Sequence, residues 1–234
     1  AVRLRPDRPL WAMRPLSFCP TIFPSNAALQ TYRRELADRI EVCGKTSLAP
    51  LSEGALFANG FFPSFNLAHH RQNNRRLMQQ FASLFAPHLR PRRLRPNAGR
   101  PRIGFVVTPF HEEGFLRTMG GVVAGLDSHK FQTLVFCAAG QIPRQKLYIP
   151  RDSVEWVPLP DRLPQAADCI AEAGCHALYF HKIGADVLGY LLPMARLAPV
   201  QFTSWSTHLT SGVPTLDFYL SSQLAELDSA DEDY

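Results

Sequence analysis

Apolar and polar positions follow two different rhythms along the chain, and the change falls near residue 100. Before it, apolar residues recur every three or four positions, most clearly over 27–42. The positions are Leu29, Tyr32, Leu36 and Ile40. This spacing marks one face of an α-helix, and Ser25 or Asn26 can cap its first turn, so the pattern predicts a helix here.

A second helix is predicted over 73–87, where Pro87 supplies a stop signal. Its apolar side carries Leu77, Phe81, Leu84 and Phe85. The connection between the two helices, 54–74, is rich in aromatic residues. We expect three of them to pack against a neighbouring part of the molecule, namely Phe61, Phe62 and Phe65.

After residue 100 the apolar positions gather in short runs separated by helical patterns. The run 102–107 is almost wholly apolar, as expected for a strand buried on both faces of a sheet. Further strands are predicted at 131–137, 153–159, 175–180, 200–205 and 216–222, with helices at 115–126, 164–174 and 186–197. Alternating strands and helices predict an α/β fold with a mostly parallel sheet.

Arginine and proline separate these two regions. Six arginines and three prolines fall in 90–102, which favours a solvated linker over regular structure. We therefore expect a helical segment at 1–88, a linker at 89–101 and an α/β lobe at 102–234. The basic half raises nucleic-acid binding as an alternative, but no aromatic residue lies among the arginines to stack on bases.

The composition narrows the class of protein. Of the residues, 46% are hydrophobic and 19% charged, as in soluble globular proteins. No apolar run approaches the roughly 20 residues that span a membrane, so no membrane partner is expected. The five cysteines form no C-x-x-C pair, which favours a reducing, cytoplasmic setting. Because the chain starts at Ala1 and ends at Tyr234 after an acidic run, we expect a fragment of a longer protein.

The candidate site follows from the predicted sheet. Ligands bind beyond the carboxyl ends of parallel strands, where loops and helix N-termini converge. Three of these loops each carry a histidine: His111, His181 and His208. Imidazole suits acid–base chemistry near neutral pH, although any single loop histidine is more often simply solvated.

Several other chemistries find no support. The chain has no G-x-G-x-x-G, no phosphate-binding G-x-x-x-x-G-K-[ST] and no G-x-S-x-G. No Cys/His spacing indicates zinc, so no metal site is predicted. A core or loop-anchoring role for Trp205 is as consistent with the pattern as a ligand contact.

Within 196–234, RLAPVQFTSWSTHLTSGVPTLDFYLSSQLAELDSADEDY resembles the bacterial branch of the O-GlcNAc transferase (SPINDLY-like) family, glycosyltransferase family 41. The corresponding family block reads W-G-[HY]-P-x-T-[ST]-G followed by a D-[YF] strand. Further matches are RIGFVV with KFQTLVF, FHKIGAD at 180–186 and FNLAHHRQNN at 65–74. The opening LRPDRPLW is similar to the exit from a last tetratricopeptide repeat.

The resemblance implies a GT-B enzyme, with two Rossmann-like lobes that face a cleft. It implies transfer of a sugar, GlcNAc in most members, from a UDP-sugar to serine or threonine of an acceptor protein, without metal or cofactor. Carried onto this sequence, it makes His111 and Glu113 the candidates for acid–base work or acceptor orientation. The candidate substrate-binding residues are His181, Gly184, Ser206, His208, Thr210, Ser211 and Gly212.

Three loop positions depart from the family pattern. Ser206 stands where the family has glycine, Glu113 stands where the family has histidine, and Lys182 stands where the family has an acidic residue. These departures keep open a non-catalytic interaction protein with a degenerate transferase lobe. The arginines of 90–102 keep open, more weakly, a nucleic-acid-binding module. The resemblance ends where the second lobe should begin, so we expect no turnover by this chain alone.

Overall fold

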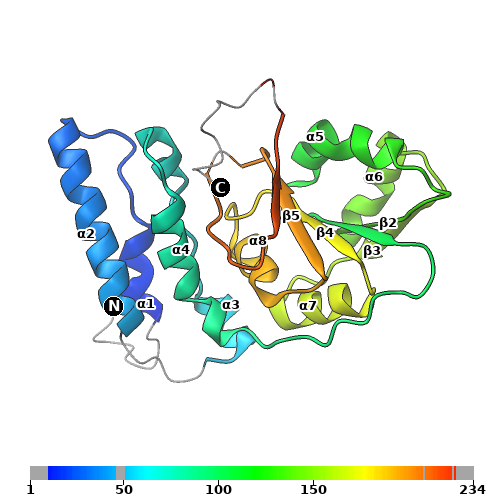
Figure 1. Cartoon of the computed structure of the whole chain (residues 1–234), viewed down its shortest axis with the longest axis horizontal. Helices are drawn as coiled ribbons and strands as arrows, with labels where there is room; N and C mark the ends of the chain where they lie inside the picture. The colour runs from blue at the N-terminus through cyan, green and yellow to red at the C-terminus, as the bar shows by residue number, and fades with distance from the viewer. Residues whose placement is uncertain (1–9, 46–50, 208, 223, 225–234) are drawn as a thin grey trace.

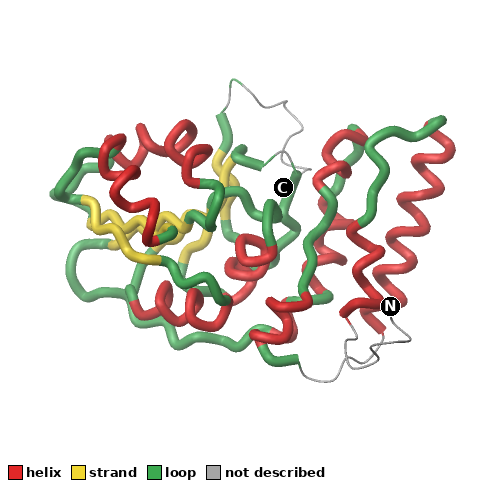
Figure 2. Tube along the Cα trace, turned by 180° about the vertical axis from the view of Figure 1, so that it is seen from behind, coloured by secondary structure: helices red, strands yellow, loops and turns green. Residues whose placement is uncertain are grey.

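A computed structural model describes residues 10–45, 51–207, 209–222 and 224. A group of helices stands beside an α/β lobe whose sheet is covered by further helices, as Figure 1 shows. Figure 2 gives the reverse view, with the strands confined to one side of the molecule. No helix in the described ranges is long and apolar enough to cross a membrane.

The helical part confirms both predicted helices. Its helices are α1 (Leu10–Met13), α2 (Asn26–Lys45), α3 (Glu53–Asn59) and α4 (Arg75–Ser83). Short 3-10 turns follow at Arg14–Ser17, Phe65–His70 and Ala86–His88. Helix α2 buries Leu29, Leu36 and Ile40, the face that the spacing predicted. Helix α3 was not predicted; the Ser52 hydroxyl accepts from the amide of Ala55 and caps it.

The sheet confirms the α/β prediction. It has six strands, all parallel, in the order β3-β2-β1-β4-β5-β6. They are β1 (Arg102–Val106), β2 (Gln132–Cys137), β3 (Val154–Pro158), β4 (Ala177–Phe180), β5 (Val200–Ser204) and β6 (Phe218–Leu220). The covering helices are α5 (Glu112–Gly125), α6 (Ile142–Tyr148), α7 (Leu163–Glu172) and α8 (Val187–Leu191), with 3-10 turns at Ala139–Gln141 and Leu192–Ala195. This is the strand order of Rossmann-like folds.

The central strands β1, β2 and β4 bury both of their faces, as their unbroken apolar runs indicated. In β1 and just after it, Phe105 and Val107 belong to the core under α5, together with Phe115 and Met119 of that helix. Val106 points to the opposite core, which α7 and α8 cover. Successive side chains of a strand face opposite sides, so a strand between two helical layers must be apolar throughout.

The helical part and the lobe share one core. The ring of Phe61 meets that of Phe85 edge-to-face, with 5.0 Å between centroids, and Phe85 in turn contacts Tyr190 at 6.0 Å. The expectation that Phe61 packs inward is therefore confirmed, and Phe62 packs against the same core. Phe65 does not belong to this core, and its side chain remains 45% exposed.

The arginine-rich connection is not simply solvated, which corrects the sequence-based expectation. The side chain of Arg92 is only 5% exposed and forms ion pairs with Glu53 and Asp168. Glu53 begins α3 and Asp168 lies on α7, so Arg92 joins the helical part to the lobe. The prolines prevented a helix, as predicted, but the extended chain that they enforce brings this guanidinium to two carboxylates.

Candidate functional site

The strand order reverses at the centre of the sheet, and in α/β sheets such a point is where a crevice forms at the carboxyl edge. Strands β1 and β4 are neighbours, and the chain leaves them toward opposite sides of the sheet. Loops that diverge in this way leave room for a ligand between them. The two loops here run from Val107 to His111 and from His181 to Asp186.

The carboxylate of Asp186 is contacted by three polar groups in this crevice. The Thr108 hydroxyl donates to its Oδ2 at 2.6 Å, His111 Nε2 lies 3.2 Å from the same oxygen, and the amide of Gly189 donates to Oδ1 at 2.7 Å. Burial by itself raises the pKa of Asp186, but the hydrogen bonds from His111, Thr108 and Gly189 outweigh it and hold the pKa below its ordinary value. Asp186 is therefore an ionised partner for His111.

The sequence reasoning missed this role for Asp186. Its one available signal was the final position of FHKIGAD, the segment that also supplied Lys182. Gly189 contributes through its size, because a Cβ there would lie 3.0 Å from Asp186 Oδ2 and 3.3 Å from the Thr108 hydroxyl. A side chain at this position of α8 would crowd the contact between the carboxylate and the threonine.

One ring nitrogen of His111, Nδ1, is left to accept a proton. Its side chain is 17% exposed, and its Nε2 faces Asp186. A carboxylate at one nitrogen stabilises the tautomer with the proton on that nitrogen, which leaves the lone pair of the other, Nδ1, to accept a proton. This is the geometry of a histidine base oriented by an acid.

Glu113, the predicted partner of His111, lies elsewhere. Its carboxylate pairs with Arg144 of α6 at 3.0 Å and is 63% exposed, so the structure does not bring it to His111. Its neighbour Glu112 is buried, and its Oε1 has no hydrogen-bond partner within the described ranges. Asp186 thus takes the place that sequence reasoning gave to Glu113.

His181 is a buried residue of the crevice floor. It is 1% exposed, its Nδ1 lies 3.3 Å from the Tyr179 hydroxyl, and its ring packs edge-to-face on Phe115. Its Nε2 is buried with no partner among the residues that the structure covers. Burial lowers the pKa of His181 to about 3, and the charges of Lys182 and His111 make smaller contributions in the same direction.

The lowered pKa of His181 predicts that the folded protein loses stability in acid. The folded pKa of about 3 lies below the ordinary 6.5, so between these values the unfolded chain binds a proton that the folded chain does not. The contribution of neutral His181 to the free energy of unfolding is therefore fully present above pH 6.5. It falls as the pH drops below 6.5, by up to about 1.4 kcal/mol per pH unit. Urea denaturation at pH 7 and pH 5 should show a steeper loss for the wild type than for His181→Gln. Parallel losses in the two proteins would contradict this assignment.

Ser206, which replaces the family's glycine, joins two loops. Its Oγ accepts from the amide of Lys182 at 3.2 Å and from the Tyr179 hydroxyl at 3.4 Å. Lys182 has a positive φ of 52°, and Gly184 follows with a φ of 83°. Two of the three departures from the family pattern, Ser206 and Lys182, are thus linked by a hydrogen bond.

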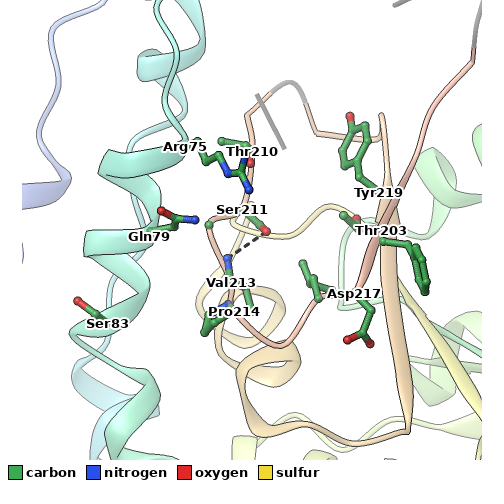
Figure 3. A pocket seen from close by; sticks show the side chains of 13 residues that line it. Arg75, Gln79, Ser83, Thr203, Thr210, Ser211, Val213, Pro214, Asp217 and Tyr219 are labelled. Carbon is green, nitrogen blue, oxygen red and sulfur yellow. Dashed lines mark hydrogen bonds between the residues drawn. The ribbon is translucent and has the colours of Figure 1, made fainter. Parts of the chain in front are cut away.

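Thr210, Ser211 and Gly212 line a different hollow. Figure 3 shows this cleft between α4, which contributes Arg75 and Gln79, and the chain after β5. Its volume is about 780 Å³. The described residues of its lining do not include those of the crevice, so the structure divides the predicted site residues into two groups. His208 lies outside the described residues.

Gly212 has a packing reason to be glycine. Its φ is 63°, and a Cβ there would lie 2.2 Å from the carbonyl carbon of Met78 and 2.4 Å from the amide nitrogen of Gln79. The loop therefore rests directly on the backbone of α4. Among the described residues, no group of three or more His, Cys, Asp or Glu could hold a metal ion.

No protein-family model matches the chain, and no curated protein sequence matches it either. Among solved structures it is similar to a mutant O-GlcNAc transferase of Thermobaculum terrenum, with a TM-score of 0.54 and 18% sequence identity. The similarity covers 86% of this chain and 38% of that chain. It shows a common fold: the protein has a Rossmann-like α/β lobe of the kind found in GT-B glycosyltransferases.

Proposed function

We propose that this chain is the acceptor-side lobe of a UDP-sugar-dependent protein O-glycosyltransferase, with a helical segment at 1–88, a connection at 89–101 and the lobe at 102–234. The observation that carries the proposal is the His111–Asp186 pair in the crevice between β1 and β4. The similar transferase extends well beyond the matched 38%, so a second, donor-binding lobe is part of this proposal.

In the proposed reaction His111 is the general base. Its Nδ1 takes the proton of a serine or threonine hydroxyl as the hydroxyl oxygen bonds to the anomeric carbon of the sugar. The bond from that carbon to the diphosphate breaks, and UDP leaves with the electron pair. Asp186 stabilises the imidazolium that forms, so the proton transfer needs no reorganisation of the site.

The substrates follow from the same reasoning. GlcNAc on UDP is the donor that we propose, and no resident metal or cofactor takes part. The cleft lined by Thr210 and Ser211 borders α4, so an acceptor peptide passing between the helical part and the lobe would meet both. A cytoplasmic location fits this proposal.

Sugar transfer should depend strongly on Asp186. In the complete protein, Asp186→Asn and His111→Ala are expected to lower kcat by roughly 100-fold or more, with KM for the UDP-sugar little changed, because they act on proton transfer. Mass spectrometry of acceptor proteins incubated with UDP-GlcNAc measures the product. His129→Ala is the matched control, since His129 is exposed and lies on the loop that precedes β2.

Two results would overturn the proposal. One is a complete protein that takes up no UDP-GlcNAc in calorimetry at high ligand concentration. The other is full activity in His111→Ala. The first result would favour the second candidate, a non-catalytic interaction protein, which Lys182 and Ser206 support because both depart from the family's site pattern.

A further inference from the structure

The cleft that Thr210 and Ser211 line has room for a ligand. Its volume of about 780 Å³ lies within the range of sites that hold ligands in proteins. One wall is helix α4, and the other is the chain after β5 together with β6. Because Gly212 rests on the backbone of α4, the two walls are held against each other at that point.

The described residues of the α4 wall are all polar. They are Arg75, Gln79 and Ser83, which recur every four residues and therefore lie along one side of the helix. The opposite side of α4 is apolar and buried, with Leu77 and Phe81 in the core. The polar stripe is about 12 Å long, which is the length of roughly four residues of an extended peptide.

Arg75 brings a positive charge to this cleft that no carboxylate balances. Among the described residues, its guanidinium forms no ion pair and no hydrogen bond, and Figure 3 shows it extending from α4 toward Thr210 and Ser211. Asp217 is the one carboxylate among the described lining residues. Both Nη atoms of Arg196 bind that carboxylate, at 2.6 and 3.0 Å, so it neither neutralises Arg75 nor repels an anion.

The place of Arg75 in α4 does not favour the stability of the helix. Arg75 is its first residue, and the first turn contains no acidic residue. The amides of a helix N-terminus carry partial positive charge, so a cation there destabilises the helix by about 0.3–1 kcal/mol. The charge of the neighbouring Arg76 acts on Glu41 of α2, whereas Arg75 has no such partner among the described residues. Stability therefore does not explain an arginine at this position.

The opposite wall offers groups that suit a peptide. The hydroxyls of Thr210 and Ser211 can bond to amides and carbonyls of a peptide backbone. Apolar contact comes from Pro214, Leu216 and Phe218, the last of which is 61% exposed. One guanidinium matches one carboxylate, whereas a diphosphate carries more charge than a single guanidinium offsets. The lining thus favours a peptide with an acidic side chain over a nucleotide.

One loop leads from the cleft to the crevice between β1 and β4. Ser206 accepts from the amide of Lys182 in the crevice, and Thr210, four residues later, lines the cleft. Four residues of chain span at most about 14 Å, so one extended peptide can reach both places.

We propose that this cleft binds an acidic segment of the acceptor protein, and that Arg75 selects the segment by pairing with a glutamate or aspartate carboxylate. A guanidinium can hold a carboxylate through two parallel N–H···O bonds, while Gln79, Thr210 and Ser211 bond to the peptide backbone. The binding of an acidic peptide stands without the proposed function. The identification of that peptide as the acceptor rests on it.

Two fluorescein-labelled octapeptides that differ only in carrying two glutamates or two glutamines test the cleft. Fluorescence anisotropy with the whole chain should show tighter binding of the glutamate peptide. Arg75→Met should weaken that binding by about three- to tenfold and leave the glutamine peptide unaffected, because it removes the charge and keeps most of the side-chain length. Arg75→Glu should prefer the lysine analogue instead. Both variants should keep or raise the melting temperature, since they remove a cation from a helix N-terminus.

Arg76→Met is the matched control. It removes an equal charge from the next position of α4, which is not among the described residues of the cleft, so it should leave the binding of the glutamate peptide unchanged. Equal affinity of the wild type for the glutamate and glutamine peptides would overturn the site, and so would equal effects of Arg75→Met and Arg76→Met. Tighter competing binding by UDP or by a single-stranded oligonucleotide would show that the cleft is not a peptide site.

The assignment to the acceptor has a separate measurement. In the complete protein, Arg75→Met should raise KM for a serine peptide that carries glutamates, with kcat and KM for the UDP-sugar little changed. An unchanged KM for that peptide would show that the acidic segment is not the acceptor. The anisotropy measurements contain no sugar donor, so a complete protein that transfers no sugar would overturn the proposed function and leave their outcome unaffected.

Discussion

Replacing Gly212 with alanine is expected to lower the free energy of unfolding by about 3 kcal/mol, because two penalties add. A Cβ at this position would lie 2.2 Å from the carbonyl carbon of Met78, and that backbone atom cannot turn away as a side chain would. The positive φ of 63° adds the strain that an L-residue meets in the left-handed region. Urea denaturation followed by circular dichroism measures the loss.

The matched control for this variant is Gly54→Ala. Gly54 lies in the first turn of α3, and a Cβ there meets nothing within 4 Å. Its free energy of unfolding should stay equal or rise slightly, as for any glycine replaced by alanine in a helix. A fully stable Gly212→Ala protein would show that the loop after β5 does not rest on α4. The expected result would mean that the T-S-G glycine of the family pattern serves packing in this chain.

Arg92→Ala should destabilise the protein by about 3 kcal/mol, since it leaves a buried carboxylate without its partner. Arg92 Nη2 donates to Glu53 Oε2 at 2.7 Å, and its Nε donates to Asp168 Oδ1 at 2.9 Å. Glu53 is only 9% exposed in its side chain, and without the guanidinium its carboxylate keeps the amide of Arg90 as a donor but loses its opposite charge. Chemical denaturation near neutral pH measures the loss.

Arg93→Ala is the control for this variant. Arg93 is the next residue along the chain and is exposed, so its replacement should change the free energy of unfolding by less than about 0.5 kcal/mol. A double variant, Arg92→Ala with Glu53→Gln, should recover part of the stability because it removes the unpaired charge. Equal effects of Arg92→Ala and Arg93→Ala would mean that the connection is solvated, as its sequence first indicated.

The elements of this fold follow closely from sequence because each depends on local spacing. The period of α2 and the apolar runs of β1 and β2 predicted their positions to within a few residues. Helix α6 was missed, since IPRQKLY carries too few apolar residues to show a helical period. It is held by Ile149 and Gln145, which become buried only when the helix meets α5 and the sheet.

The candidate site was predicted in outline. The rule that ligands bind at strand ends placed His111 and His181 at one edge, and the structure puts both there. Sequence could not choose Asp186 over Glu113 as the partner of His111. Glu113 is two residues away along the chain but is turned toward Arg144, whereas Asp186 is 75 residues away and reaches His111 across the crevice.

By itself, the sequence determined the α/β class, the boundaries of most strands and helices, and the edge of the sheet where a site can form. Hydrophobic period and turn residues act over a few positions, so they are readable without the rest of the molecule. Only the tertiary structure decided that Arg92 is buried, that Gly212 rests on α4, and that Ser206 binds the amide of Lys182. Each of these contacts joins residues more than 20 positions apart, and packing of the whole chain brings them together.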